Sequence, residues 1–157
     1  CKGITLQQVR KAVNLLANNG IRTKGFFMVG HPGETVETAE KTIRFALELP
    51  LDDFQMSFLT PFPGTCIYHE VDKWGTLTEN WEEMNMWTPV FIPNGMTREE
   101  LVQLQSKAMR SFYLRPRIMW RYLMTCLTKP SVIGAVFRGG MALLGGIFSH
   151  ERAGRKD

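Results

Sequence analysis

Apolar and polar residues follow two different periods over the first sixty positions. The spacing is helical over 5–19 and 36–49, whereas 24–30 is a short apolar run of buried-strand type and 53–59 alternates in part. These patterns predict helix, strand, helix and strand in that order, which makes two parallel strands joined by a crossover helix. The residues suited to cap or end these elements are Thr5, Gly20, Thr35 and Pro50.

The middle of the chain combines helices with one irregular stretch. A helix is expected over 65–75, and prolines in the aromatic-rich segment 76–96 prevent long regular elements there. Thr97 and Glu100 form a capping box that opens a further helix. The apolar stripe expected on that helix is Leu101, Leu104, Ala108 and Phe112.

Two prolines divide the C-terminal third. Pro116 separates the preceding helix from another over 117–127, and Pro130 separates that one from the apolar segment 131–149. The last segment is long enough to be tested as a membrane span, but its five glycines and Arg138 favour an interfacial or packed helix.

The fold class expected from this order is α/β. Two parallel strands do not make a stable sheet alone, because parallel sheets are buried on both faces and have several strands. The simplest interpretation is that the chain is the C-terminal part of a larger α/β protein. A complete small α/β ligand-binding domain is an alternative.

The charge is unevenly distributed along the chain, and the cysteines indicate the cellular compartment. The net charge is +4, but residues 110–157 carry nine Lys and Arg against two Asp and Glu, a net +7, and residues 1–109 carry −3. The cysteines, Cys1, Cys66 and Cys126, form neither a CxxC motif nor a disulfide framework, so a reducing, cytoplasmic setting is expected.

The basic C-terminal third predicts a partner of opposite charge, or else it is an ordinary solvated helical face. Nucleic acid is not expected, because base-stacking aromatics are not interleaved with the basic residues in a known pattern. An anionic membrane surface is the partner expected for a helix that combines apolar residues with arginines, and membrane association is therefore a further expectation. The arginines concerned are Arg110, Arg115, Arg117 and Arg121.

The segment between the first strand and the second helix carries candidate binding chemistry. The strand ends at Gly30 and a helix follows at once, which places backbone N–H groups at the carboxyl edge of the sheet, where α/β folds bind ligands. A phosphate loop is excluded, because Glu34 and Thr35 stand where the Walker A motif requires Lys and Ser or Thr. Glu34 suits a hydroxyl or ammonium group, or it simply favours the helix N-terminus, and the structural role is preferred.

The sequence TPFPGT at 60–65 likewise follows a strand and precedes a helix. A strand ending in G-x-P-G-E-T and the next ending in T-P-x-P-G-T together resemble the second half of the radical S-adenosylmethionine (SAM) barrel. The resemblance is to the branch with an N-terminal cobalamin-binding domain, which includes the anaerobic magnesium-protoporphyrin monomethyl ester cyclase, related Fe-S oxidoreductases and several C-methyltransferases. The tract at 111–116 is also typical of this branch, and the resemblance covers about residues 2–125.

This resemblance implies an architecture. It makes 1–75 the last two strands and helices of a partial (β/α) barrel, 76–96 an irregular connection, and 97–157 a helical C-terminal extension. The partner it implies is the missing N-terminal part of the same protein. The chain alone would be catalytically inert, as one portion of an oxidoreductase or methyltransferase.

The resemblance also implies cofactors. Complete members hold a 4Fe-4S cluster through CxxxCxxC and use it to cleave SAM reductively to a 5′-deoxyadenosyl radical, and cobalamin is a further cofactor of the branch. This chain lacks the CxxxCxxC motif, so no metal ligand and no catalytic residue is assigned. The resemblance also implies candidate residues of the SAM site. The family's G-x-I-x-G-x-x-E element, with one extra residue before the Glu, matches Gly25, Met28, Gly30 and Glu34. The strand end that contacts adenine in the family matches Leu59, Thr60 and Pro61.

Other residues are weaker candidates. His31 lies in the turn and is expected to face solvent rather than a ligand. Aromatic and methionine side chains of the irregular segment either line a pocket for a large planar or isoprenoid substrate or seal the loop onto the core, and sealing is preferred. They are Trp81, Met86, Trp87 and Phe91. A function of another class, a membrane-surface or partner-binding helical module on an α/β scaffold, stays open.

Overall fold

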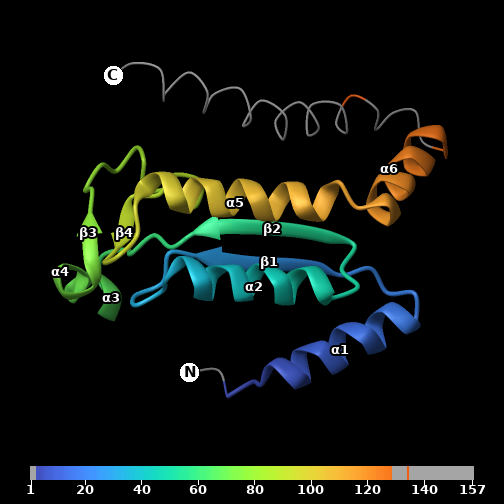
Figure 1. Cartoon of the computed structure of the whole chain (residues 1–157), viewed down its shortest axis with the longest axis horizontal. Helices are drawn as coiled ribbons and strands as arrows, with labels where there is room; N and C mark the ends of the chain where they lie inside the picture. The colour runs from blue at the N-terminus through green and yellow to red at the C-terminus, as the bar shows by residue number, and fades with distance from the viewer. Residues whose placement is uncertain (1–2, 129–133, 135–157) are drawn as a thin grey trace. The chain divides into compact units, whose positions relative to one another are not determined.

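The computed structural model describes residues 3–128 and residue 134 (Figure 1). The chain divides into two compact units, 1–108 and 109–157, which are described separately. Apart from residue 134, the apolar segment 131–149 lies outside the described residues.

The first unit is built on two parallel strands. β1 (Lys24–Val29) pairs with β2 (Asp53–Phe58), and the register sets Lys24 opposite Asp53 and Val29 opposite Phe58. Helix α2 (Val36–Glu48) joins the strands, and α1 (Leu6–Asn18) precedes them. The predicted alternation of helices and strands is confirmed, as is the parallel pairing. The described residues supply only these two parallel strands, so they do not show a barrel.

Side-chain caps begin the three long helices of this unit where the sequence predicts them. The Thr5 side chain accepts from the Gln8 N–H at 3.2 Å, and Gln8 Oε1 accepts from the Thr5 N–H at 2.8 Å. Thr35 caps α2 in the same way, and Thr97 caps α5 (Arg98–Tyr113) with Glu100 as its partner. These bonds satisfy N–H groups that have no acceptor inside a helix.

Burial is uneven across the sheet. The apolar side of β2 is fully buried through Phe54, Met56 and Phe58, and the stripes predicted for α2 and α5 are buried as well. On β1, however, Phe26 is 71% exposed. The expectation that 24–30 is a buried strand is therefore wrong for one of its faces, because among the described residues no further strand or helix covers Phe26. The buried members of the helical stripes are Ala39, Ile43, Ala46, Leu101, Leu104, Ala108 and Phe112.

The helix expected over 65–75 is divided in two. α3 (Cys66–His69) and α4 (Val71–Trp74) meet at Glu70, whose φ and ψ of −110° and 15° are not helical. The segment expected to be irregular contains two short antiparallel strands, β3 (Gly75–Leu77) and β4 (Phe91–Pro93). Position 75 must be glycine, because a Cβ there would collide with the carbonyl oxygen of Ile92.

Helix α5 runs beside β2, and α2 runs beside β1 (Figure 1). The Gln105 side chain of α5 donates to the Met56 carbonyl at 2.9 Å, and the Phe58 N–H donates to the Met86 carbonyl at 3.0 Å. These bonds occupy backbone groups of β2 that do not pair with β1. One edge of the sheet is therefore protected within the chain itself.

The second unit contains the end of α5 and helix α6 (Pro116–Thr128). The Tyr113 ring stands edge-on to Phe112 at 5.2 Å and lies 6.2 Å from the Tyr122 ring. Ile118 is buried, so α6 has one packed side. Among residues 3–128 and 134, every helix is too short or too polar to span a bilayer.

Replacing Lys107 with Gln should raise the pKa of Glu40. Lys107 Nζ lies 2.5 Å from Glu40 Oε1, and this hydrogen bond and the lysine charge hold the carboxyl pKa below its ordinary 4.5. Because the pKa is depressed in the folded state, the pair stabilises the fold above pH 4.5 and loses this effect as pH falls through the folded value. An NMR titration of Glu40 in both proteins measures the change, with Lys41→Gln as control. An identical Glu40 pKa in all three would show that no such pair forms.

Candidate functional site

The two candidate turns meet at the carboxyl ends of the parallel strands. The Leu59 N–H, just past the end of β2, donates to the Val29 carbonyl at 2.9 Å. This bond continues the ladder by one residue and sets the turn that starts at Gly30 beside the turn that starts at Leu59. In parallel sheets this edge is where ligands bind, so the structure brings together the two segments that the sequence singled out.

Gly30 shapes the first turn. Its φ of +92° lies in the left-handed region, which side chains rarely adopt, and the residue is buried. A Cβ at this position would lie 3.5 Å from Leu101 Cδ2 and 4.0 Å from the Leu59 nitrogen. The neighbours alone would tolerate that atom, so glycine is required here by its backbone angle.

The Glu34 side chain holds the same turn together through hydrogen bonds to its backbone. Its Oε2 accepts from the Gly30 N–H at 2.6 Å and from the His31 N–H at 3.2 Å. The Glu34 N–H in turn donates to the His31 carbonyl at 2.9 Å. The preferred structural role of Glu34 therefore has a direct basis, since the carboxylate satisfies two N–H groups just before α2. Both side-chain bonds end on Oε2, which leaves Oε1 facing no donor among the described residues.

The second turn is buried beneath the loop that follows α4 and β3. Leu59, Thr60 and Pro61 are all buried, and the Thr60 hydroxyl donates to the Asn85 carbonyl at 3.1 Å. Asn85 Oδ1 accepts from two N–H groups further along its own loop, those of Trp87 and Thr88. These residues are buried as a whole, so the turn presents little surface of its own.

Sequence reasoning did not identify Asn85 as a partner of this turn. An Asn whose side chain bonds the backbone two and three residues on is a recognisable turn signal. It marks a turn but does not reveal which strand end the turn covers.

Gly25 and Met28 lie further back on β1. A Cβ on Gly25 would lie 2.6 Å from Leu51 Cδ1 and 2.7 Å from Phe27 Cε2, so a side chain there would force these two side chains to shift. Met28 is half-buried and lies opposite Ser57 of β2. Of these two, only Met28 is close in sequence to the strand end.

The other candidate ligand-binding residues differ in how far they are buried. Phe91 is 1% exposed and belongs to the core, which agrees with the sealing role, and His31 faces solvent as expected. Trp81, Met86 and Trp87 are exposed, so the sealing role preferred for them is wrong.

The described residues do not fit a 4Fe-4S cluster. Within them no three His, Cys, Asp or Glu side chains are close enough to share a metal ion, and Cys66 is exposed on α3. The same region fits part of an organic ligand better. It offers the Glu34 carboxylate, whose Oε1 can accept from a hydroxyl or an ammonium group.

Glu34→Ala should destabilise the fold by about 1–3 kcal/mol, because it leaves the buried Gly30 N–H without an acceptor. Glu34→Gln should cost less, since an amide oxygen can still accept both bonds. Urea unfolding measures each, and Glu37→Ala is the matched control because Glu37 is an acidic residue three positions on, in the first turn of α2. Equal losses for Glu34→Ala and Glu37→Ala would show that only helix-end charge matters.

Gly25→Ala should also destabilise the fold, by about 1–3 kcal/mol, through overpacking against Leu51 and Phe27. Adding Leu51→Ala should be less harmful in the Gly25→Ala background than in the wild type, because it removes the side chain with which the new methyl group collides. A double-mutant cycle in urea tests this. Strict additivity of the two changes would contradict the packing role.

No family model matches the chain. It is 39% identical over 119 residues to an uncharacterized methyltransferase of Pyrococcus horikoshii, which covers 75% of this chain and 26% of that protein. It is 31% identical over 137 residues to the anaerobic magnesium-protoporphyrin IX monomethyl ester cyclase of Rubrivivax gelatinosus, covering 80% of this chain and 24% of the cyclase. The bacteriochlorophyllide d C-12(1)-methyltransferase of Chlorobaculum tepidum is 27% identical over 116 residues, covering 74% of this chain and 25% of that enzyme.

The chain thus spans about a quarter of the length of the curated relatives it matches. In each case the similarity extends over about three quarters or more of this chain, and the resemblance inferred from the two strand-end motifs is confirmed. The chain belongs to the group of homologous proteins that contains these methyltransferases and the anaerobic magnesium-protoporphyrin cyclases.

Proposed function

We propose that the chain is the C-terminal portion of a radical SAM enzyme of the cobalamin-binding type and contributes part of the SAM site. The observation that carries this proposal is the hydrogen bond from the Leu59 N–H to the Val29 carbonyl, which sets the two family motifs side by side. The two motifs follow parallel strands, so they lie together at the carboxyl edge, which is where parallel sheets bind ligands.

Each candidate residue has a role set by its surroundings. Gly30 supplies the left-handed backbone angle that the turn requires, while Oε2 of Glu34 holds the turn in shape. Oε1 of Glu34 accepts from a hydroxyl or ammonium group of SAM. The turn at Leu59, Thr60 and Pro61 is the strand end that the family resemblance assigns to the adenine edge.

Gly25 and Met28 support this edge from behind. Gly25 allows Leu51 and Phe27 to pack against the strand, which fixes the position of β1 relative to β2. Met28 lies two residues before Gly30 and gives the apolar approach to the turn.

The remaining parts of the active centre belong to another region of the parent protein. The cluster ligands lie outside the described residues, and a 4Fe-4S cluster bound there would supply the electron for SAM cleavage. The chain by itself is then inert. Methyl transfer and cyclisation both appear among the names of its relatives, so the proposal covers either outcome.

In the complete parent enzyme, Glu34→Gln should weaken SAM binding roughly 10- to 100-fold, the effect of losing a hydrogen bond to a charged acceptor. The variant keeps an amide oxygen for the Gly30 N–H, so stability should change little. Titration with SAM and the yield of 5′-deoxyadenosine under reducing conditions measure the effect, with Glu37→Gln as control.

Unchanged SAM affinity in the folded Glu34→Gln enzyme would remove Glu34 from the site. A parent reading frame without CxxxCxxC would overturn the proposed function as a whole. Micromolar binding of SAM by the isolated 157-residue chain would do the same, because part of a site should bind no tighter than about millimolar, roughly −4 kcal/mol.

A further inference from the structure

Helix α6 has an apolar face that is exposed rather than packed. Its packed side is formed by Ile118, which is 1% exposed, and by the half-buried Tyr122. Five large apolar residues lie on the other side, and each is at least 40% exposed. At about 100° per residue they occupy an arc of about 140° around the helix. This α6 apolar face consists of Met119, Trp120, Leu123, Met124 and Leu127.

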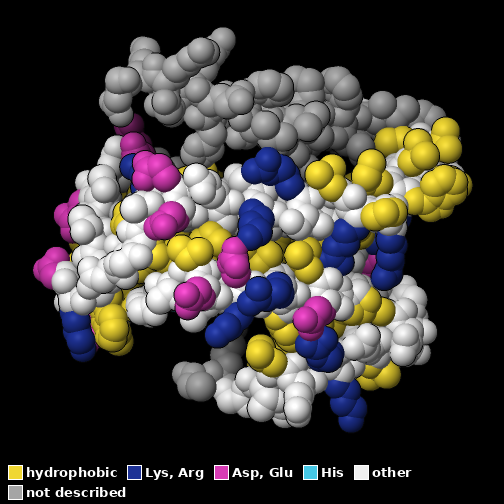
Figure 2. Space-filling model, in the orientation of Figure 1, with side chains coloured by type: hydrophobic (Ala, Val, Ile, Leu, Met, Phe, Trp, Pro, Cys, Tyr) yellow, Lys and Arg dark blue, Asp and Glu magenta, His cyan; other side chains and the backbone are white. Residues whose placement is uncertain are grey.

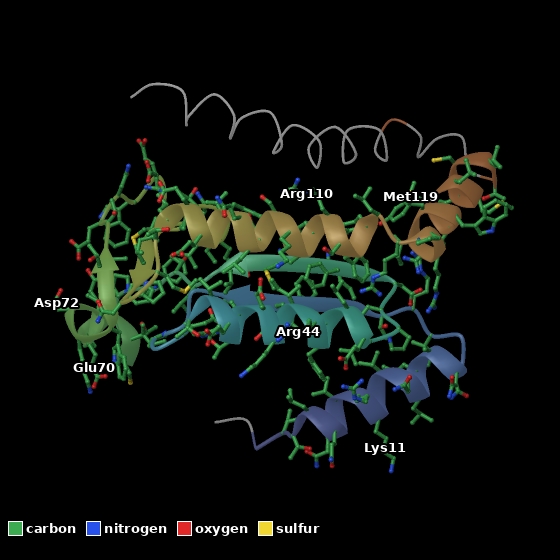
Figure 3. All side chains as sticks on the ribbon, viewed as in Figure 1. Lys11, Arg44, Glu70, Asp72, Arg110 and Met119 are labelled. Atoms are coloured by element: carbon green, nitrogen blue, oxygen red, sulfur yellow. The ribbon has the colours of Figure 1, made fainter. Side chains whose placement is uncertain are left out.

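Such exposure is unusual on a helix of this composition. Apolar stripes at spacings of three and four residues normally form the buried side of a helix, as they do on α5, where Leu101, Leu104 and Ala108 are buried. Hydrophobic side chains gather over α6 in Figure 2, and Met119 is labelled on that helix in Figure 3. An exposed apolar patch of this kind marks an interaction site.

The charges around α6 indicate the chemistry of its partner. No Asp or Glu occurs from position 101 to position 150, whereas seven Lys and Arg do. Arg117 is exposed and follows Met124 around the helix, at the edge of the apolar arc. The partner must therefore be both apolar and negatively charged.

We propose that α6 lies in the surface of an anionic membrane, with the α6 apolar face inserted and Arg117 among the lipid headgroups. Trp120 lies within this face, between Leu127 and Met124 around the helix, and tryptophan is favoured at the boundary between headgroups and acyl chains. A 13-residue helix is too short to span a bilayer but long enough to lie along its surface.

A nucleic acid fits these residues less well. It would require the basic residues to occupy the centre of the exposed face, since phosphates contribute most of the affinity. On α6 that centre is apolar, and Arg117 and Arg121 lie beyond its edge. The membrane proposal concerns a surface distant in sequence from the SAM-site candidates, so it does not depend on the proposed function.

Sedimentation of the whole chain with vesicles tests the proposal. The chain should bind vesicles of phosphatidylglycerol and phosphatidylcholine at least tenfold more tightly than vesicles of phosphatidylcholine alone. Leu123→Glu combined with Leu127→Glu should abolish binding. The matched control is Leu6→Glu with Leu15→Glu, which puts the same change on exposed leucines of α1 and should leave binding intact.

Charge and insertion can be tested separately. Arg117→Glu should weaken binding to the anionic vesicles several-fold at low salt, while Lys11→Glu on α1 (Figure 3) should not. Anionic vesicles should shift the tryptophan fluorescence of the wild-type chain to the blue, and Trp120→Phe should lose that shift. Brominated lipid should quench the same signal, which gives a result for the wild-type chain even where a charged variant fails to fold.

Four results would overturn the proposal. The first is the absence of vesicle binding, and the second is equal binding to anionic and neutral vesicles. The third is a dimer in light scattering that the Leu123→Glu, Leu127→Glu change dissociates, since a second copy would then cover this face. The fourth is RNA binding that depends on Arg117 in the absence of any lipid binding.

Discussion

The parallel pairing of β1 with β2 determines where the other features of the first unit lie. Parallel strands require a crossover between them, and α2 makes that crossover in 13 residues. Because both strands run in the same direction, the segments after Val29 and after Phe58 arrive at the same edge. The Leu59 N–H bond to Val29 then fixes their separation. The candidate site is thus a direct consequence of strand direction, and Glu34 adds only the local shape of one turn.

One edge of this sheet is covered within the chain, whereas one of its faces is exposed. On the β2 side, Gln105 and Met86 bond to backbone groups that β1 leaves unpaired. On the β1 side, Phe26 is 71% exposed, although parallel strands are normally buried on both faces. The exposed face of β1 is consistent with the proposal that the chain is one portion of a larger enzyme, because parallel sheets are normally covered on both faces.

The sequence predicted correctly those features that depend on residues close together in the chain. Caps such as Thr5 and Thr97 act over three residues, so the sequence predicted the helix starts correctly. The burial of β1 depends on neighbours far away in sequence or outside the chain, and the prediction that both of its faces are buried was wrong. In the candidate site, the sequence already favoured the structural role of Glu34, which acts on neighbours three and four residues away. The cover over Thr60 was missed because the Asn85 carbonyl that accepts from it lies 25 residues on and is a backbone atom without a residue signature.

Helices α5 and α6 show why an apolar period alone does not identify a core. Both have large apolar residues at spacings of three and four, yet those of α5 are buried and most of those of α6 are exposed. Charge distinguishes the two helices. α5 begins with Glu99 and Glu100 and uses Lys107 in an ion pair within its own unit, whereas α6 has arginines and no acidic residue. A helix that only packs within its own protein has no need to exclude acidic residues from its solvent side. Their exclusion from α6 is explained if that side meets a surface that is itself negative.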